Sequence, residues 1–434
     1  MKLEEKLVID ERFVFTTKAK NKVFTIIGLG LFLFALGMYM VMSGGGHHED
    51  AHGAVQAAGH AAKGHHEAFN WMTRVWVNLW HNTVFFAGVS VMGVFIVAYN
   101  YVAYAGWSAG LIRVPMSFGS FLPYAFGIML IVFFFGHHDL FHWTHDGLTD
   151  PNSPHFDRII AGKSGFLNTP FYLIRMVIYF SLWIYINHLI RKNSFAEDIN
   201  GTHTYWHKNT IVCTVFLIIF GVTSSMSAWD FVMSVDPHWF STMFGWYVFA
   251  SWHVSAIAAV TLIVVLLKER GYLTIVTENH LHDLGKFMFA FSIFWTYIWF
   301  SQFLLIFYAH IPEETVYFLD RMKNFGNHYT GLFYLNIFIN FIFPFLVLMT
   351  RDAKRHMIIL KIVSIAILFG HWLDFYLMLT PGTLKGHSGF GPLEIGTALV
   401  FLGVFIYVIA NALSKAPLVA KNHPMLEESL HHNI

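Results

Sequence analysis

Ten apolar runs, each long enough to cross a bilayer, divide the chain. A membrane-spanning helix needs about 20 predominantly apolar residues. Runs of about this length occur at residues 23–42, 75–103, 117–137, 170–190, 210–228, 243–267, 285–309, 329–350, 358–379 and 393–413. The second run is long enough to tilt or to protrude from the bilayer. The pattern therefore predicts an all-α integral membrane protein with about ten transmembrane helices.

The distribution of Lys and Arg predicts the orientation of these spans. The arm at 1–22, alternate loops counted from it, and the tail at 414–434 together carry 19 of these residues, whereas the opposite side carries 7. Cytoplasmic loops hold the excess of Lys and Arg. We therefore expect a multi-pass membrane protein with both termini in the cytoplasm, which agrees with an even number of spans.

Composition strengthens the membrane assignment and narrows the chemistry. Hydrophobic residues make up 56% of the chain and charged residues only 12%, against about 25% charged in soluble domains. The net charge is +1 and no basic stripe is present, which argues against a nucleic-acid partner. Cys213 is the one cysteine, so the chain has no internal disulfide, thiolate-bound iron–sulfur cluster or covalent haem motif.

The stretch from Ser224 to His253 joins two apolar runs through a loop of mixed character. It places Asp230, Asp236 and His238 among aromatic residues, and His253 about ten residues into the next run. Pro237 cannot continue a helix, because proline lacks an N–H and its ring clashes with the preceding turn. Ionisable groups at such depth are costly and usually functional, so this stretch indicates proton handling or binding of a polar headgroup.

Several features recur at a fixed offset and indicate an internal duplication. Trp80-His81 is followed 172 positions later by Trp252-His253. The segment Trp229-Asp230-Phe231 has a counterpart around Asp374. We therefore predict two four-helix bundles, formed by the second to fifth spans (75–228) and the sixth to ninth spans (229–379). The first span (23–42), and an outer loop with the tenth span (380–413), flank them.

Polar residues inside the later spans outline a candidate proton path. A spacing of three places His371 and Asp374 on one helix face, and a spacing of four does the same for Asn336 and Asn340. With His253 these residues could form a path, whose outer mouth would hold the three acids Asp230, Asp236 and Glu394. The plainer interpretations stay open: the amides could only join helices, the histidines could be satisfied interior groups, and the acids could lie in interfacial water.

Two outer loops add further histidines. The third span ends in His137, His138 and Asp139, which titrate over a range that suits proton uptake or release; a wet interfacial loop is the alternative. The loop at 43–74 carries six histidines, at 47, 48, 52, 60, 65 and 66. Nothing in this Gly/Ala-rich loop fixes a tetrahedral geometry, so we predict no metal site, although metal binding there stays open. We also find no opposed histidine pairs that would hold haem.

The segment SSMSAWDFVMSVDPHWFSTMFGWYVFASWHVSA and the LFHWTHDG motif after the third span resemble the ActF subunits of bacterial alternative complex III. These subunits belong with ActC to the NrfD/PsrC-like family of polysulfide-reductase-type membrane subunits. The likeness covers the whole chain, and its DPHWFSTMFG segment is specific. The resemblance implies a subunit, without redox centres of its own, of a respiratory quinol:electron-acceptor oxidoreductase.

The resemblance also implies partners and cofactors. The partners would be an ActC-like quinol-binding membrane subunit, an iron–sulfur and molybdopterin-like peripheral subunit, multihaem cytochrome c subunits and lipids. Haem c and iron–sulfur clusters would lie in those partners, and menaquinone or quinol binding by this subunit stays open. Two other interpretations remain: a stand-alone secondary transporter built from repeats, which predicts matching helix breaks, and a purely structural membrane anchor.

Overall fold

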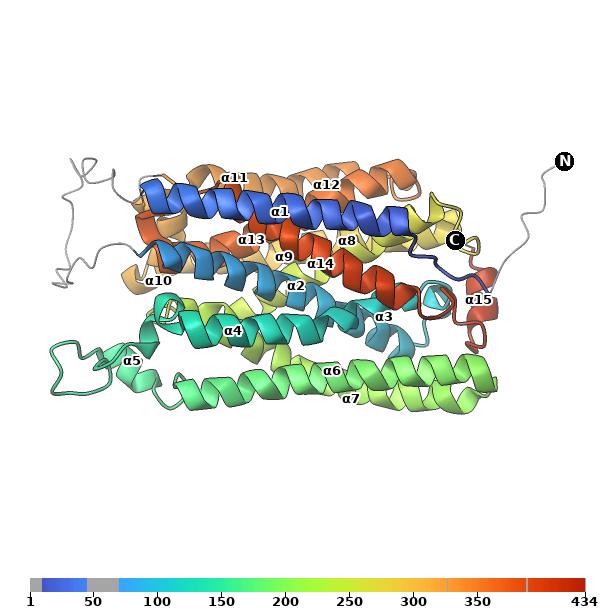
Figure 1. Ribbon diagram of the computed structural model, residues 1–434, viewed down its shortest axis with the longest axis horizontal. Coiled ribbons are helices and arrows are strands. Elements are labelled where there is room, and N and C mark those ends of the chain that lie inside the picture. Colours follow the sequence, from blue (N-terminus) through green and yellow to red (C-terminus); the bar gives the residue numbers. More distant parts are fainter. Residues whose placement is uncertain (1–9, 45–69, 326, 388, 434) are drawn as a thin grey trace.

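The computed structural model describes residues 10–44, 70–325, 327–387 and 389–433 (Figure 1). The six histidines of the loop at 43–74 lie outside these ranges. Within them, ten helical segments are long and apolar enough to cross a membrane, which confirms the all-α, multi-span prediction. They are Thr17–Ser43, Trp71–Val102, Arg113–Leu140, Thr169–Asn200, His203–Val235, Phe244–Lys268, Glu278–Ala309, Thr330–Val347, Met357–His387 and Pro392–Leu413.

Most of these spans are single long helices. These are α1 (Thr17–Gly44), α2 (Trp71–Val102), α6 (Thr169–Asn200), α7 (His203–Phe231), α8 (Phe244–Lys268), α9 (Glu278–Ala309), α13 (Met357–Leu384) and α14 (Pro392–Leu413). Two spans are broken. One consists of α3 (Arg113–Phe118), a 3₁₀ turn η2 (Gly119–Phe121) and α4 (Leu122–Leu140); the other of α11 (Thr330–Ile337), a π turn η6 (Phe338–Ile342) and α12 (Phe343–Val347).

Short elements connect the spans. They are the helices α5 (Arg158–Lys163), α10 (Pro312–Leu319) and α15 (Leu426–Leu430), the 3₁₀ turns η1 (Gly106–Ser108), η3 (His142–Thr144), η4 (Met233–Val235) and η7 (Lys385–His387), and the π turn η5 (Asp320–Asn324). Because the two broken spans occupy different places in the two halves, the helix breaks do not match as a repeat-built transporter would predict.

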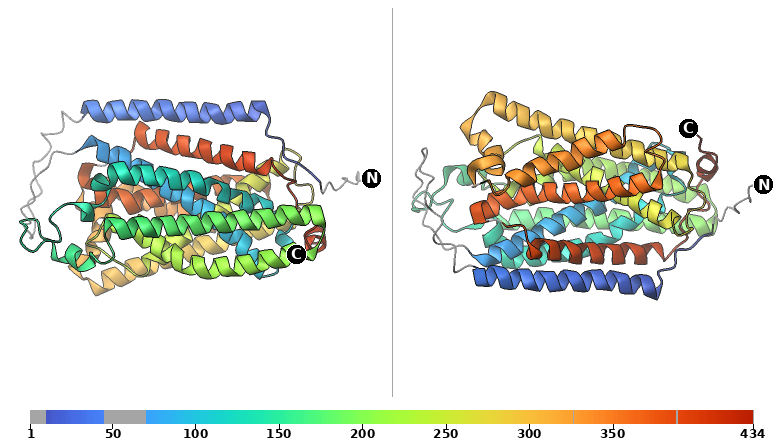
Figure 2. Two further views of the ribbon diagram at one scale, coloured as in Figure 1. Left: turned by 60° about the horizontal axis from the view of Figure 1, so that its bottom comes forward. Right: turned by 90° about the horizontal axis from the view of Figure 1, so that it is seen from above.

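The spans of the two predicted groups, the second to fifth and the sixth to ninth, pack around a shared centre. Helix α2 packs on α4 and α7, and α6 packs on α7; in the second group α8 packs on α9 and α13, and α13 on α11. Helices α2 and α8 also contact each other, and most residues in the apolar stretches of both helices are buried. Helix α1 lies at the edge of the molecule against α14 (Figure 2).

Equivalent aromatic contacts in the two groups agree with an internal duplication. The Trp80 ring of α2 lies 6.2 Å from the Phe231 ring of α7. At the corresponding place, the Trp252 ring of α8 lies 5.8 Å from the Phe375 ring of α13. The two tryptophans are 172 positions apart, as the sequence pattern indicated. Each phenylalanine directly follows an aspartate, Asp230 or Asp374, so the repeat places one carboxylate in each group.

The stretch from Ser224 to His253 is more helical than its sequence indicated. Helix α7 continues through Phe231, so Asp230 lies in its last turn and is buried rather than in the loop. Hydrogen bonds from Arg175 and Tyr179 to the Asp230 carboxylate allow the extra turn. The following 3₁₀ turn η4 ends just before Asp236, and Pro237 lies in the loop beyond it.

A buried arginine satisfies a carbonyl that a proline leaves unpaired. Pro381 lies inside α13, and its missing N–H removes the helical hydrogen bond to the carbonyl four residues earlier, which is that of Leu377. Arg321, only 4% exposed, donates from Nε to Leu377 O at 2.8 Å and from Nη2 to Met378 O at 3.1 Å. This contact fixes η5 against the C-terminal half of α13.

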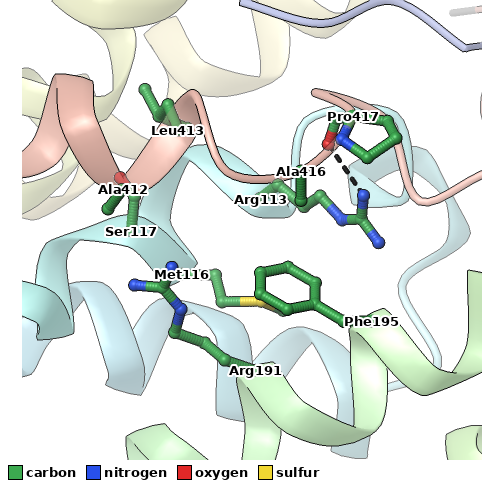
Figure 3. Close-up of a pocket in the computed structure, with 9 residues that line it drawn as sticks. All are labelled: Arg113, Met116, Ser117, Arg191, Phe195, Ala412, Leu413, Ala416 and Pro417. Carbon is green, nitrogen blue, oxygen red and sulfur yellow. Dashed lines mark hydrogen bonds between the residues drawn. The ribbon is translucent and has the colours of Figure 1, made fainter.

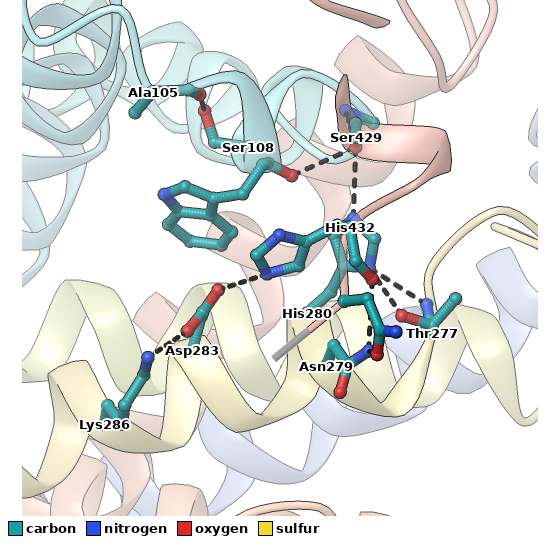
Figure 4. A network of polar contacts seen from close by, with 12 residues as sticks. Ala105, Ser108, Thr277, Asn279, His280, Asp283, Lys286, Ser429 and His432 are labelled. Carbon is teal, nitrogen blue, oxygen red and sulfur yellow. Dashed lines mark hydrogen bonds and ion pairs between the residues drawn. The ribbon is translucent and has the colours of Figure 1, made fainter. Parts of the chain in front are cut away.

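The two end segments of the described chain meet at one end of the bundle. Leu418 N donates to Glu11 O at 2.8 Å, and the backbones of Arg12 and Pro417 form an isolated antiparallel β-bridge. Arg113 Nη1 donates to Pro417 O at 2.7 Å (Figure 3). Farther along, His432 Nε2 lies 2.6 Å from Asp283 Oδ2 (Figure 4). The segment after α14 therefore crosses this end and contacts both helix groups.

Candidate functional site

A fully buried carboxylate, that of Asp374 in α13, lies at the centre of the second helix group. It accepts four hydrogen bonds from three other helices. Trp295 Nε1 and Ser251 Oγ donate to Oδ2 at 3.0 and 2.5 Å. Asn336 Nδ2 donates to Oδ1 at 2.9 Å, and the Tyr247 hydroxyl donates to the same oxygen. All four donors are neutral, so they orient the carboxylate without cancelling its charge.

The basic group that accompanies Asp374 is an imidazole. His371 lies one turn earlier on α13 and is fully buried, with Nδ1 3.8 Å from Asp374 Oδ2. The spacing of three in the sequence predicted this shared face. An imidazole carries charge only when protonated, so its charge, like that of the carboxylate, changes with one proton. A lysine or arginine would not allow this change.

Ser251 of α8 bridges the two groups. Its Oγ lies 2.5 Å from Asp374 Oδ2 and 2.9 Å from His371 Nδ1. A hydroxyl carries one hydrogen and can both donate and accept. When Ser251 donates to Asp374, Nδ1 must donate to Ser251; when Asp374 is protonated and donates, Ser251 donates to Nδ1. The bridge can therefore pass a proton in either direction.

Two asparagines extend this hydrogen-bonded chain. Asn340 Nδ2 donates to Asn336 Oδ1 at 2.6 Å, and Asn336 then donates to Asp374. Asn340 lies within the π turn η6, and π turns are frequent at functional sites. A side chain at Gly370 would lie 2.2 Å from Asn340 Oδ1, so only glycine lets the amide lie so close to α13. Asn340 Oδ1 and His371 Nε2 have no hydrogen-bond partner among the described residues.

The carboxylate of Asp230, which the repeat pairs with that of Asp374, is neutralised. Arg175 binds it with two hydrogen bonds, Nε to Oδ2 at 2.9 Å and Nη2 to Oδ1 at 2.7 Å. The Tyr179 hydroxyl donates to Oδ2 at 2.9 Å. Both charged side chains are buried. A bidentate arginine holds its partner ionised, so this site is suited to structure rather than to proton exchange.

Glu394 is neutralised in the same way at the start of α14. Arg74 Nε and Nη2 donate to its two oxygens at 2.8 and 2.9 Å. Asn78 Nδ2 and the Gly391 N–H add bonds at 3.0 and 2.8 Å. The predicted outer-mouth acids Asp230 and Glu394 therefore each lie in a separate ion pair. Asp236 is half-buried in the loop after η4.

His253 lies in an aromatic enclosure rather than in the hydrogen-bonded chain. Its ring lies 4.3 Å from that of Phe291, 5.4 Å from that of Phe95 and 5.8 Å from that of Phe249. It is 1% exposed, and neither nitrogen has a hydrogen-bond partner among the described residues. The structure thus brings His371, Asp374, Asn336 and Asn340 together and leaves His253 apart from them.

The histidines in the last turn of α4 and just after it lie at one end of the first group. The rings of His137 and His138 are 4.2 Å apart, and Asp139 Oδ1 accepts from Asn70 Nδ2 at 3.1 Å and from Thr73 Oγ1 at 3.0 Å. The pKa of His142, just beyond α4, is lowered by burial and by the neighbouring imidazole of His145. No hydrogen bond among the described residues joins this end to Asp374.

Sequence reasoning missed three of the four donors to Asp374. Tyr247 and Ser251 are spaced by four on α8, so they share a helix face, and this spacing was an available signal. Trp295 of α9 gave no such signal in the sequence. A buried acid was also missed at the opposite end: Glu197 of α6 is fully buried, and its two oxygens have no hydrogen-bond partner among the described residues.

Comparisons with known proteins add no family. No protein-family model matches the chain, and no curated protein matches it. Among the described residues, no group of three or more His, Cys, Asp or Glu side chains is placed to hold a metal ion. The chemistry of the site is therefore argued from its own geometry.

Proposed function

We propose that this chain is an integral-membrane subunit of a respiratory quinol:electron-acceptor oxidoreductase of the alternative complex III type. Its part would be to hold partner subunits and to contribute a transmembrane proton path. The observation that carries the path is the buried carboxylate of Asp374, which has neutral donors and one titratable base within reach. Asp230 and Glu394 each have an arginine partner, whereas the four hydrogen bonds to Asp374 come from neutral groups.

The proton step follows from the hydrogen bonds. With His371 protonated on both nitrogens, Nδ1–H donates to Ser251 Oγ and the serine hydroxyl donates to Asp374 Oδ2. Transfer of both hydrogens along their bonds leaves a neutral imidazole with its hydrogen on Nε2, an intact serine and a protonated Asp374. One proton has moved, and a charge pair has become two neutral groups. His371 Nε2 is then the atom left to exchange a proton with the rest of the path.

The assignment to a respiratory complex rests on the sequence resemblance. The ten spans and the apolar composition agree with it. The proposed partners are an ActC-like quinol-binding membrane subunit, an iron–sulfur subunit and multihaem cytochrome c subunits. Electrons would pass through those partners, because this chain has one cysteine and no motif for covalent haem.

Purification from native membranes in mild detergent, followed by mass spectrometry, tests the assignment. Recovery with multihaem cytochromes and an iron–sulfur subunit is expected. Recovery of the chain by itself, from membranes in which such cytochromes are expressed, would contradict the respiratory assignment and favour a stand-alone transporter.

Two variants test the proton path separately. Ser251→Ala removes the bridge but keeps both titratable groups, and Asp374→Asn removes the acid while keeping its shape. Ser251→Ala should slow proton transfer through the pair by about a hundredfold, whereas Asp374→Asn should abolish it, because an amide cannot take up the proton. Both variants should lower the number of protons moved per electron by the reconstituted complex. Ser255→Ala is the matched control, because the Ser255 hydroxyl donates only to the Ser251 backbone carbonyl, one turn away.

The outcomes separate the two parts of the proposal. A normal proton-to-electron ratio in both Ser251→Ala and Asp374→Asn, in a complex that still assembles, would refute the path and leave the chain as a structural anchor. An equally lowered proton-to-electron ratio in Ser255→Ala would show that the lowered ratio of Ser251→Ala comes from general disturbance of α8.

A further inference from the structure

A buried cation lies beside the Asp374 site. Arg321 belongs to η5, which follows α10 at the end of the bundle opposite to the two end segments (Figure 1). Its side chain is buried, and Nε, Nη1 and Nη2 donate to the backbone carbonyls of Leu377, Tyr317 and Met378. A carbonyl is neutral, and a guanidinium keeps its charge in proteins. These bonds therefore hold a permanent positive charge in place without cancelling it.

Arg321 and His371 lie on opposite sides of the Asp374 carboxylate. Leu377, whose carbonyl accepts from Arg321, follows Asp374 by three residues on α13, and His371 precedes it by three. Three residues of helix rise by about 4.5 Å, so the guanidinium lies on the order of 10 Å from the carboxylate. The acid thus has a titratable base on one side and a fixed cation on the other.

Another carboxylate lies beyond this cation. A Cβ atom added at Gly382 would lie 3.3 Å from the Asp236 Cβ, so Asp236 is next to α13 five residues past Leu377. Along α13 the order is therefore Asp374, then Arg321, then Asp236. The sequence pattern placed Asp236 at a mouth of the proton path. A proton that moved from this mouth to Asp374 would have to pass the guanidinium.

Buried aromatic rings surround the cation. The guanidinium carbon of Arg321 lies 3.4 Å from the centroid of the Tyr317 ring, which stacks on the Trp239 ring at 4.1 Å. The Phe244 ring lies 6.2 Å from Tyr317 and 5.5 Å from Trp239. It also lies 5.7 Å from the ring of Tyr247, whose hydroxyl donates to the central carboxylate. Ring contacts therefore continue from the cation to the buried acid.

The charges on the two sides of this layer act on the same ring. Burial raises the pKa of Tyr317 to about 12; the charge of Arg321 opposes this rise, whereas Asp374 and Asp236 add to it. Asp236 and Asp320 are half-buried, so water screens their charges more than that of the buried guanidinium. At about 10 Å and an effective dielectric constant of about 20, one unit charge changes a rate at least about tenfold.

We propose that Arg321 and the aromatic layer around it close the Asp236 side of Asp374 to protons, so that in this structure the acid exchanges protons only through His371. The inference rests on the proposed proton path and gives that path one open side. An arginine at a constriction excludes protons and other cations from membrane pores. Such a seal is needed because an acid open to both ends at once would let protons flow back.

Passive proton flux through the full chain in liposomes tests the barrier. A potassium gradient with valinomycin drives protons inward, and a trapped pH-sensitive dye reports them. Arg321→Gln keeps an amide that can donate to the carbonyls but removes the charge, so it should raise the flux at least about tenfold. Arg321→Lys keeps the charge and should stay near wild type. Arg158→Gln is the matched control, because Arg158 is exposed on α5 at the same end of the bundle (Figure 1).

A double variant shows whether the added flux passes through the acid. Arg321→Gln/Asp374→Asn should return to the wild-type flux, and a flux as high as that of Arg321→Gln would overturn the proposal. Equal fluxes in Arg321→Gln and Arg321→Lys would show that the arginine acts only through its shape, which would overturn the proposal too. A wild-type flux far above that of protein-free liposomes would do the same, and this measurement needs no variant to fold.

Failure of the barrier and failure of the path give different results. An unchanged flux in a folded Arg321→Gln, together with a lowered proton-to-electron ratio in Asp374→Asn, would refute the barrier and leave the path standing. A normal ratio in Asp374→Asn would refute the path itself, and the barrier with it.

Discussion

At the scale of single residues, the partner of each buried acid determines what that acid can do. Asp230 and Glu394 each accept two hydrogen bonds from an arginine. Desolvation of such charges is offset by the fixed opposite charge, and neither acid gains by taking up a proton. Asp374 has only neutral donors and the imidazole of His371, so protonation is its other route to neutrality.

Removal of Arg175 should lower the stability of the folded protein far more than removal of the whole charge pair. Arg175→Met leaves the Asp230 carboxylate buried and unpaired, which costs about 3–5 kcal/mol. In the double variant Arg175→Met/Asp230→Asn no charge remains, and the amide oxygen can still accept from Tyr179. We expect the double variant to recover at least about half of the loss. Unfolding in mixed micelles, followed by tryptophan fluorescence, measures both.

The stability that the double variant recovers relative to Arg175→Met is the decisive comparison. If the double variant is as unstable as Arg175→Met, then packing of the arginine on Phe166 and Phe171, whose ring centroids lie 3.8 and 4.3 Å away, dominates over charge.

At the scale of elements, glycines allow α1 to approach α14 closely. A Cβ atom added at Gly37 would lie 2.3 Å from Leu393 N, and one at Gly396 would lie 2.3 Å from Phe34 N. In a bilayer, lipid tails are as apolar as the side chains, so close backbone packing of this kind drives helix association. Apart from this contact, α1 is largely exposed, with only 17% of its span buried.

Gly37→Ala should therefore weaken the α1–α14 pair, whereas Gly28→Ala should not. A methyl group at Gly37 forces the helices apart and should cost about 1–3 kcal/mol. Gly28 lies on the same helix with nothing within 4 Å of an added Cβ, so it is a matched control and gains slightly in helix propensity. The midpoint of thermal unfolding in detergent compares them. Equal midpoints for the two variants would contradict close glycine packing.

At the scale of the whole molecule, the two helix groups have the same plan but different polar interiors. In the first group, Arg175 and Tyr179, spaced by four on α6, donate to Asp230. In the second, Asn336 and Asn340 have the same spacing on the corresponding span, and Asn336 donates to Asp374. An amide thus stands where the other group has a guanidinium. This difference leaves Asp230 bound to an arginine and Asp374 with neutral donors, as the proposed proton path requires.

The segment after α14 joins the two groups and should loosen in acid. His423 lies in it beside Arg113 and Tyr101, and burial lowers its pKa to about 4 from an ordinary value of 6.5. The unfolded or undocked segment binds the proton more readily, so docking is strongest above pH 6.5 and weakens as the pH falls toward 4. The full difference is about 3 kcal/mol.

Hydrogen exchange of residues 415–433 across this pH range measures the effect. His423→Gln removes the titrating group and should flatten the dependence. A wild-type segment that stays equally protected at pH 6.5 and pH 4.5 would contradict the prediction, and so would an unchanged pH dependence in the variant.

Much of the architecture could be predicted from the sequence. Length and hydrophobicity fix the number of spans, because a helix must satisfy its own backbone hydrogen bonds in lipid. Helical spacing placed His371 beside Asp374 and Asn336 beside Asn340. The recurrence of Trp80-His81 as Trp252-His253 indicated the repeat. The end of α7 was placed too early, because burial of Asp230 against Arg175 makes an extra polar turn favourable.

The sequence by itself thus determined which residues share a helix and a face, because those relations depend on the rise and pitch of one helix. Only the tertiary structure decided which acids meet an arginine. Arg74 and Glu394 are 320 positions apart and Ser251 and Asp374 are 123 apart, so their contacts depend on how separate helices cross. Helix packing therefore decided that Asp230 and Glu394 bind an arginine and that Asp374 does not.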